Sequence, residues 1–343
     1  MPTHAQSQSS NVDFRLTALE RWLGSRFGDT AFTLAPASED ASFRRYWRAR
    51  LADGRSYIAM DAPPEREDCG PFVHVAALLR AAGVHAPQVH AEDRAQGFLL
   101  LTDLGDTTFL AALSERDAAP LMRDATEALL RWQLATRPGE LPPYDEALLR
   151  RELALFPQWY IGRHLGRTLD TAARRSLDEV GTLLVRSALA QAQVYVHRDY
   201  MPRNLMLCDP NPGVLDFQDA VLGPISYDMA SLTRDAFLSW DEEQVLDWTV
   251  RYWEMAKRAG LPVERDFAEF WRAFEWMGLQ RHLKVLGIFA RLSHRDGKPG
   301  YVADTPRFVG YARAVAGRYA PLAPLARLFD QLEGSAPRAG YTF

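Results

Sequence analysis

The sequence predicts an α+β fold in which a strand-rich N-terminal part is followed by a helical C-terminal part. Short aromatic or alternating segments, separated by polar turns, are typical of antiparallel strands. Such segments occupy residues 31–34, 43–51, 55–60 and 98–101. After residue 107, apolar residues recur at helical spacing through most of the chain.

Length and composition limit the possible classes of protein. A chain of 343 residues is longer than one small core usually takes, so we expect two lobes. The formal net charge of -4 provides no general attraction to nucleic acid or to an anionic membrane, and neither is an expected partner. The two cysteines, Cys69 and Cys208, are too few for a disulfide framework. With no recognisable secretory signal, we expect a cytoplasmic monomer.

The N-terminal part divides into a tail, a lobe and a hinge. Residues 1–11 are polar and predict a flexible tail, and a first helix is expected at 12–26. The expected N-terminal lobe, 12–101, contains the four strands and a helix at 71–82. The polar, glycine-bearing segment 102–106 is the expected hinge.

The remaining residues, 107–343, form the expected helical lobe. Apolar periodicity predicts its helices at 108–114, 117–135, 144–164, 170–192, 226–256, 265–293 and 306–319.

One motif indicates the chemistry. The run from His197 to Asn204 reads His-Arg-Asp-Tyr-Met-Pro-Arg-Asn, and Asp216 follows twelve residues after Asn204 in an Asp-Phe pair. This is the H-R-D-x-x-x-x-N and D-F-x arrangement of phosphoryl-transfer enzymes in the protein-kinase superfamily. The motif therefore predicts a kinase with a two-lobed, protein-kinase-like fold. Asp199, Asn204 and Asp216 are all present, which argues against a pseudokinase.

The motif assigns a role to each polar residue. Asp199 is the expected catalytic base that accepts or orients the proton of the substrate hydroxyl. Asn204 and Asp216 offer oxygen ligands, which Mg²⁺ prefers. His197 is expected to orient the loop by hydrogen bonding. Asp228 is expected to accept backbone N–H bonds from the loop, or to be a carboxylate at a helix N-terminus, and the two roles are compatible.

The nucleotide side departs from the protein-kinase pattern. Residues 38–48 stand in the place of the glycine-rich loop but contain no glycine, so backbone N–H groups around Ser42 and Phe43 are expected to form the anion nest. Met60 stands where a lysine would pair with the phosphates. We expect a neighbouring arginine to replace that cation, and the alternative is that these arginines form a solvated strand face. The candidates are Arg44, Arg45 and Arg48.

The hinge is expected to contact the base of ATP through its backbone. The contacting residues would be Leu101, Thr102 and Leu104.

Four segments carry a closer resemblance. Residues 60–65, 156–160, 197–204 and 277–287 are similar to the bacterial N-acetylmuramate/N-acetylglucosamine anomeric kinases, within the aminoglycoside phosphotransferase branch. The resemblance extends from about residue 12 to 335. It implies ATP-dependent phosphorylation of the C1 hydroxyl of an amino sugar to the α-1-phosphate, in peptidoglycan recycling. It also implies that a methionine at position 60 belongs to this subgroup.

A cationic helix face fits such a substrate. Gln280, Arg281, Lys284 and Arg291 lie roughly on one face of the predicted helix at 265–293. N-acetylmuramate carries a carboxylate that a guanidinium matches, whereas a polycationic aminoglycoside would need acidic residues. The alternative is a solvated basic face.

Two other residues are candidates for the sugar site. Arg203 lies within the catalytic loop and is expected to contact an anion or, alternatively, to lock the loop through an ion pair. Trp159 has an aromatic face that can stack on a pyranose, with packing in the core as the alternative.

Two other functions stay open at this stage. One is a different small-alcohol kinase, acting on an aminoglycoside, choline or homoserine. The other is a nucleotide-binding module without turnover, which the absent lysine and absent glycine-rich loop would favour.

Overall fold

The computed structural model describes residues 5–38, 43–114 and 116–333, and within these ranges it describes the side chains of residues 14 to 332. The chain divides into two compact units. The first contains Met1–Thr108 and Met206–Gln218, and the second contains Phe109–Leu205 and Asp219–Phe343. The break after Thr108 follows the expected hinge. The segment Met206–Gln218, which we expected in the helical lobe, belongs to the first unit.

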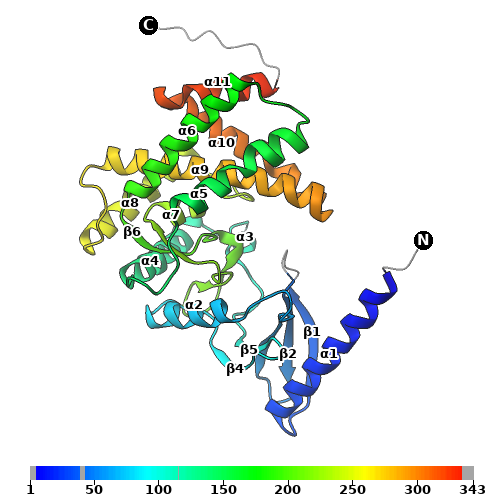
Figure 1. Cartoon of the computed structure of the whole chain (residues 1–343). Helices are drawn as coiled ribbons and strands as arrows, with labels where there is room; N and C mark the ends of the chain where they lie inside the picture. Colours follow the sequence, from blue (N-terminus) through cyan, green and yellow to red (C-terminus); the bar gives the residue numbers. More distant parts are fainter. Residues whose placement is uncertain (1–4, 39–42, 115, 334–343) are drawn as a thin grey trace. The chain divides into compact units, whose positions relative to one another are not determined.

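The first unit is built on a five-stranded antiparallel sheet with the order β1-β2-β3-β5-β4 (Figure 1). Its strands are β1 (Phe32–Ser38), β2 (Arg45–Leu51), β3 (Ser56–Asp61), β4 (Val89–Asp93) and β5 (Phe98–Thr102). The four strands that the sequence predicts are confirmed. We did not predict β4, because this edge strand is only partly buried, has no continuous apolar run and pairs irregularly between Val89 and Ala91.

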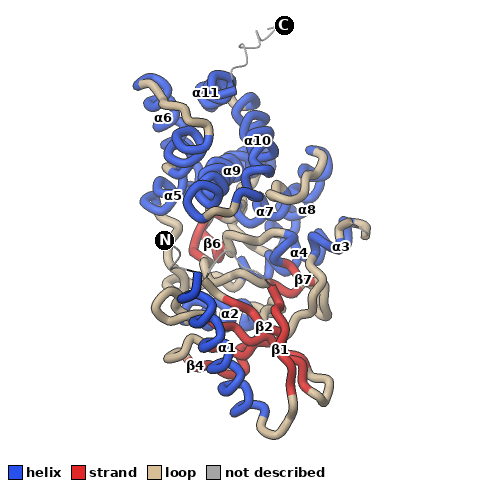
Figure 2. Tube along the Cα trace, turned by 90° about the vertical axis from the view of Figure 1, so that its right-hand side faces the viewer, coloured by secondary structure: helices blue, strands red, loops and turns tan. Residues whose placement is uncertain are grey.

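Two helices accompany the sheet. α1 (Ala5–Phe27) begins earlier than the helix predicted at 12–26, so residues 5–11, which we expected in a flexible tail, are helical. Figure 2 shows α1 alongside the strands of the sheet. Its Leu19 and Trp22 pack in one cluster with Phe98 of β5. The helix predicted at 71–82 is confirmed as α2 (Gly70–Ala81).

The second unit is mostly helical and contains the short strand pair that leads into the loop carrying the motif, whereas the strand pair after that loop falls mainly in the first unit. Its helices are α3 (Phe109–Ala112), α4 (Ala118–Leu134), α5 (Glu146–Leu153), α6 (Thr171–Ala190), α7 (Tyr227–Thr233), α8 (Glu242–Arg258), α9 (Phe267–Asp296), α10 (Thr305–Arg318) and α11 (Ala323–Glu333). The strand β6 (Gln193–Val196) pairs with β9 (Val221–Pro224), and β7 (Leu205–Met206) pairs with β8 (Gly213–Val214). Within the described part of the chain, no helix is both long and apolar enough to cross a membrane.

Two predicted helices are interrupted. The helix expected at 144–164 is α5 followed by a π-helix, Phe156–His164, because Pro157 supplies no N–H for an α-helical bond. The helix expected at 226–256 is α7 and α8, and the second of these starts at a capping box formed by Asp241 and Gln244. The last helix, α11, was not predicted.

The core of the second unit surrounds α9, which contacts the π-helix, α6, α7 and α10 (Figure 1). Gly287 lies at the contact between α9 and the residue before the π-helix. A Cβ atom at this position would come within 2.6 Å of the Leu155 carbonyl oxygen. Glycine therefore permits a close approach of the two backbones.

We expect Gly287→Ala to lower the free energy of unfolding by about 1–3 kcal/mol, because the added methyl group would overpack a rigid backbone contact. Gly278→Ala is the matched control on the same helix, since its nearest neighbours would lie 3.7 Å or more from the new Cβ. Alanine has the higher helix propensity, so the control should be neutral or stabilised by up to about 1 kcal/mol. Urea denaturation of both variants measures the difference. Equal effects would contradict the close-packing argument.

Candidate active site

The carboxylate of Asp228 holds the start of the loop from His197 to Asn204 in place. It leaves β6 and ends in the short 3₁₀ turn Pro202–Asn204. Asp228, in the first turn of α7, accepts the backbone N–H of His197 at 2.7 Å and that of Arg198 at 3.0 Å. Both predicted roles of Asp228, as a loop acceptor and as a helix N-terminal carboxylate, are confirmed.

Hydrogen bonds within the loop fix the backbone around Asp199. The carbonyl oxygen of Asp199 accepts Asn204 Nδ2 at 2.9 Å and the N–H of Met201 at 3.0 Å. The N–H of Asp199 is 3.3 Å from Nδ1 of the buried His197, which can accept it. The backbone of Asp199 is therefore held on both sides of its side chain, and this side chain is only partly buried.

Burial dominates the ionisation of Asp228. It raises the pKa of this carboxyl group to about 7, although the N–H groups of His197 and Arg198 favour the charged form. The loop is thus hydrogen-bonded to a carboxylate whose charge is unfavourable to bury.

The Asp199 side chain lines a small cavity of about 120 Å³ in the second unit. The cavity also receives Arg203, Arg281 and Lys284, three of the predicted substrate residues. Aromatic and aliphatic side chains complete the wall, among them Tyr227, Phe237, Val285, Ile288, Phe289 and Tyr301. The structure therefore brings the expected base together with three cations in a largely apolar enclosure.

Arg281 is the most deeply placed of these cations. Its side chain is 2% exposed, and its Nη1 has no hydrogen-bond partner among the residues that the structure describes. Arg203 is exposed, and its guanidinium lies 4.9 Å from the ring centroid of Phe237. Near both arginines, burial raises the pKa of the Asp235 carboxyl group, while Arg281 and Arg203 act in the opposite direction.

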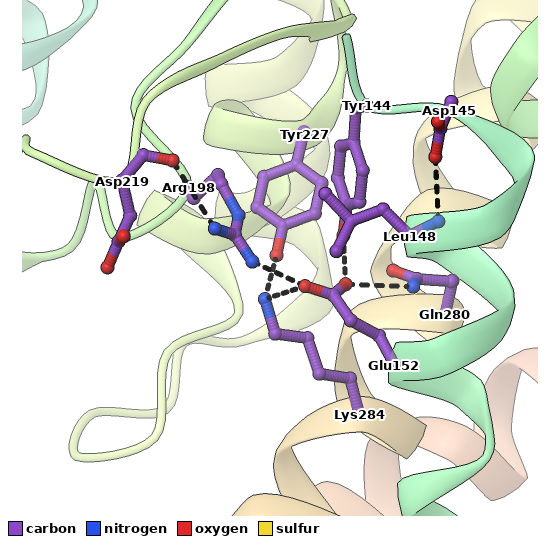
Figure 3. A network of polar contacts seen from close by, with 9 residues as sticks. All are labelled: Tyr144, Asp145, Leu148, Glu152, Arg198, Asp219, Tyr227, Gln280 and Lys284. Atoms are coloured by element: carbon purple, nitrogen blue, oxygen red, sulfur yellow. Dashed lines mark hydrogen bonds and ion pairs between the residues drawn. The ribbon is translucent and has the colours of Figure 1, made fainter. Parts of the chain in front are cut away.

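Lys284 reaches the cavity from a polar network (Figure 3). Its Nζ donates to the Tyr227 hydroxyl at 3.2 Å and lies 3.0 Å from Oε1 of Glu152. Burial lowers the pKa of the Lys284 ammonium, but Tyr227 and Glu152 outweigh burial and raise it above its usual value. Lys284 is therefore charged at neutral pH.

Two predicted substrate residues lie elsewhere. Gln280 directs its Nε2 to Oε2 of Glu152 at 3.4 Å and does not line the cavity. Trp159, in the π-helix, packs against the core cluster of the second unit, and it too is absent from the cavity wall. The structure thus supports the core-packing alternative for Trp159.

The residues predicted to bind the nucleotide all belong to the first unit. One of them, Ser42, lies outside the described residues. Phe43 directs its N–H to Glu67 at 3.3 Å. The three arginines near the fully buried Met60 each pair with a carboxylate. Arg44 pairs with Glu67 at 3.1 Å, Arg48 pairs with Asp103 at 2.8 Å, and Arg45 pairs with the buried Asp61.

The hinge backbone is partly engaged within the first unit. The N–H of Thr102 is donated to the Gln88 carbonyl at 3.0 Å, and Leu101 pairs with strands on both sides. Leu104 is buried.

Asp216 lies in the first unit, after β8, with a positive φ of 62°. Its Oδ1 accepts Gln218 Nε2 at 3.0 Å. Beside it, Phe217 is buried against Phe72, with ring centroids 4.8 Å apart.

The residues that connect this cavity to the loop from His197 to Asn204 were not predicted. Glu152, Tyr144 and Tyr227 form the network around Lys284 in Figure 3. Their partners lie far away in the sequence, and a single glutamate on a helix with neighbouring arginines carries no recognisable motif. The one available signal was a glutamate among apolar positions of the predicted helix.

Comparison with known proteins places this site in a family. The profile of the phosphotransferase enzyme family matches residues 33–271. The chain is 51% identical to an N-acetylmuramate/N-acetylglucosamine kinase from Pseudomonas putida, over 94% of this chain and 98% of that protein. It is 54% identical to a protein of the same name from Pseudomonas aeruginosa, over 88% of this chain and 89% of that protein.

Solved structures agree on the fold. The GDP complex of wild-type aminoglycoside 2'-phosphotransferase-IIIa superposes with a TM-score of 0.59 at 14% sequence identity, covering 89% of this chain and 99% of that one. The predicted kinase-like α+β fold is confirmed.

The ionisation of Asp228 should make the free energy of unfolding depend on pH. A free aspartate titrates near pH 4, so between about pH 4 and 7 the native state binds more protons than the unfolded state. The free energy of unfolding should then fall as pH rises through this window, by up to about 1.4 kcal/mol per pH unit. Asp228→Asn removes the titration and should give a flatter profile in urea denaturation at pH 4.5–8. Parallel profiles would contradict the assignment.

Proposed function

Because this chain belongs to the phosphotransferase enzyme family, we propose that it uses ATP to phosphorylate the C1 hydroxyl of N-acetylmuramate and of N-acetylglucosamine. The product would be the α-1-phosphate, formed in peptidoglycan recycling. The observation that carries this proposal is the cavity in which Asp199 lies with Arg203, Arg281 and Lys284. The names of the two Pseudomonas relatives support the choice of sugars.

Asp199 would act on the sugar hydroxyl. Phosphoryl transfer has a loose transition state, so the protein contributes mainly by positioning the reactants and by stabilising charge. The fixed backbone of the loop aims the Asp199 carboxylate into the cavity, where it can accept or orient the hydroxyl proton.

The three cations would bind the acidic group of the sugar. N-acetylmuramate differs from N-acetylglucosamine by a lactyl ether that ends in a carboxylate. The unpartnered Nη1 of Arg281 needs an acceptor, and a carboxylate oxygen is a strong one. Lys284 and Arg203 add positive charge around the same volume. A cationic substrate such as choline or an aminoglycoside would be repelled.

The first unit would bind the nucleotide. We propose that Phe43, Arg44 and Arg48 face the phosphates and that Leu101, Thr102 and Leu104 face the base; Ser42 was predicted to join the first group. The N–H of Thr102 is already donated to the Gln88 carbonyl, so Thr102 would contact the base through another group.

Asn204 and Asp216 would each offer an oxygen to Mg²⁺, and the donor chemistry of an amide and a carboxylate fits this hard cation. Bound there, the ion would neutralise charge on the transferred phosphate.

The dependence on ATP suggests that the enzyme works in the cytoplasm. Asp199 and the three cations all come from one chain, so we propose that a monomer is sufficient for activity.

The regiochemistry is directly testable. Incubation with ATP and either sugar should give a product whose phosphorus couples to the anomeric proton in NMR spectra, and phosphate at another carbon would exclude the proposal.

Asp199→Asn should lower kcat by about 10²–10⁴-fold, because it removes the base. Nucleotide affinity, measured by calorimetry, should stay unchanged.

The role of Arg281 can be tested with the two sugars as a matched pair. Arg281→Gln should lower kcat/KM for N-acetylmuramate by about 10- to 100-fold, because it removes a charge-assisted hydrogen bond. The effect on N-acetylglucosamine should be much smaller. Arg291→Gln, on the same helix but outside the cavity wall, is the control and should change neither value. Equal decreases in kcat/KM for both sugars would show that Arg281 does not bind the carboxylate.

A further inference from the structure

We propose that Glu152 is a positioning residue, which fixes the catalytic loop through Arg198 and the cavity cation Lys284 through a second ion pair. The proposal deepens the proposed function and rests on it for the choice of substrates. Glu152 is not part of the cavity wall, so it would act only through its partners.

Four side chains converge on the Glu152 carboxylate (Figure 3). The residue lies on α5 and is 6% exposed. Its Oε1 accepts Lys284 Nζ at 3.0 Å and also pairs with Nη2 of Arg198. Its Oε2 accepts the Tyr144 hydroxyl and Gln280 Nε2. Both oxygens are therefore occupied, and one carboxylate joins α5, α9 and the loop.

Arg198 connects Glu152 to the expected base. It is the residue before Asp199, and its φ of 75° is unusual for a residue with a side chain. Its N–H is donated to Asp228 at 3.0 Å, while its Nη1 donates to the Asp219 carbonyl at 3.3 Å. With Glu152 at the other end of the guanidinium, the backbone and the side chain of Arg198 are both anchored. The direction in which Asp199 leaves the loop is thereby fixed.

The charges in the network depend on one another. Burial raises the pKa of Glu152, but Lys284 and Arg198 outweigh burial and lower it below its usual value, so the carboxylate stays ionised. Two buried cations share this one anion. Removal of its charge would leave Arg198 and Lys284 side by side without the anion that pairs with both, and only the charge of Asp199 would then act on them, which is unfavourable in a buried site.

The test compares Glu152→Gln with Glu146→Gln. Glu146 lies on the same helix but is exposed and, among the residues that the structure describes, pairs only with Arg150 one turn away, so it is the matched control. Glu152→Gln keeps the shape of the side chain and removes its charge. We expect kcat to fall by about 10²-fold on both sugars, because the loop loses its anchor at the Arg198 side chain and a displacement of about 1 Å is enough for such a loss. The control should keep the wild-type kcat.

A pH profile separates positioning from a general loss of stability. In wild type, Lys284 stays protonated because Tyr227 and Glu152 raise its pKa above the usual value. In Glu152→Gln, the negative charge that counteracts the effect of burial is gone, so the pKa of Lys284 falls. The value of kcat/KM for N-acetylmuramate should then decline as pH rises through this lowered pKa. Glu152→Asp, which restores the charge, should remove that alkaline decline.

A substrate-independent measurement completes the test. Hydrogen exchange of the peptide containing residues 197–204 should accelerate in Glu152→Gln relative to a peptide from α8, and it should not accelerate in Glu146→Gln. If wild type phosphorylates neither sugar, the proposed function fails, and the exchange data alone decide the role of Glu152. Wild-type kcat together with unchanged exchange in Glu152→Gln would overturn the inference.

If Glu152→Gln does not fold, Arg198→Met tests whether the connection from Glu152 to the loop matters for activity. It leaves the Glu152 and Lys284 pair intact and removes only the connection to the loop. We expect a lower kcat on both sugars with an unchanged KM for N-acetylmuramate. A wild-type kcat in this variant would overturn the inference.

Discussion

The conformation of the loop from His197 to Asn204 begins with one interaction, in which the buried carboxylate of Asp228 accepts two consecutive backbone N–H groups. A single charged side chain thereby fixes the start of the loop, and the bonds around Asp199 follow from that starting point. The charge is unfavourable to bury, since burial raises the pKa of Asp228 to about 7. The protein therefore accepts a cost in stability to obtain a defined loop geometry, a pattern expected of functional sites.

Local sequence was sufficient to predict the parts of the site that lie close together along the chain. His197, Asp199 and Asn204 share one loop, so their spacing determines much of their geometry. On α9, the helical repeat predicted Arg281 and Lys284, which line the cavity with Val285 and Ile288. Gln280 is one position before Arg281, about 100° around the helix, and it turns to Glu152 instead.

Tertiary contacts decided the rest. Glu152 could not be recognised, because its function arises only when α5, α9 and the loop pack together. Trp159 was ambiguous for a similar reason, since only packing distinguishes a core aromatic residue from a sugar platform. The breaks in two long predicted helices depended on Pro157 and on the cap at Asp241, which the apolar periodicity alone concealed.

The unpartnered nitrogen of Arg281 has a consequence for how the protein changes over evolutionary time. A buried donor without an acceptor lowers stability, and a bound anion relieves the penalty. Selection for an acidic ligand would therefore preserve a residue that selection for stability alone would remove. In a lineage that no longer meets the acidic sugar, this arginine should be among the first cavity residues to be replaced by a neutral side chain, and the replacement should make the fold more stable.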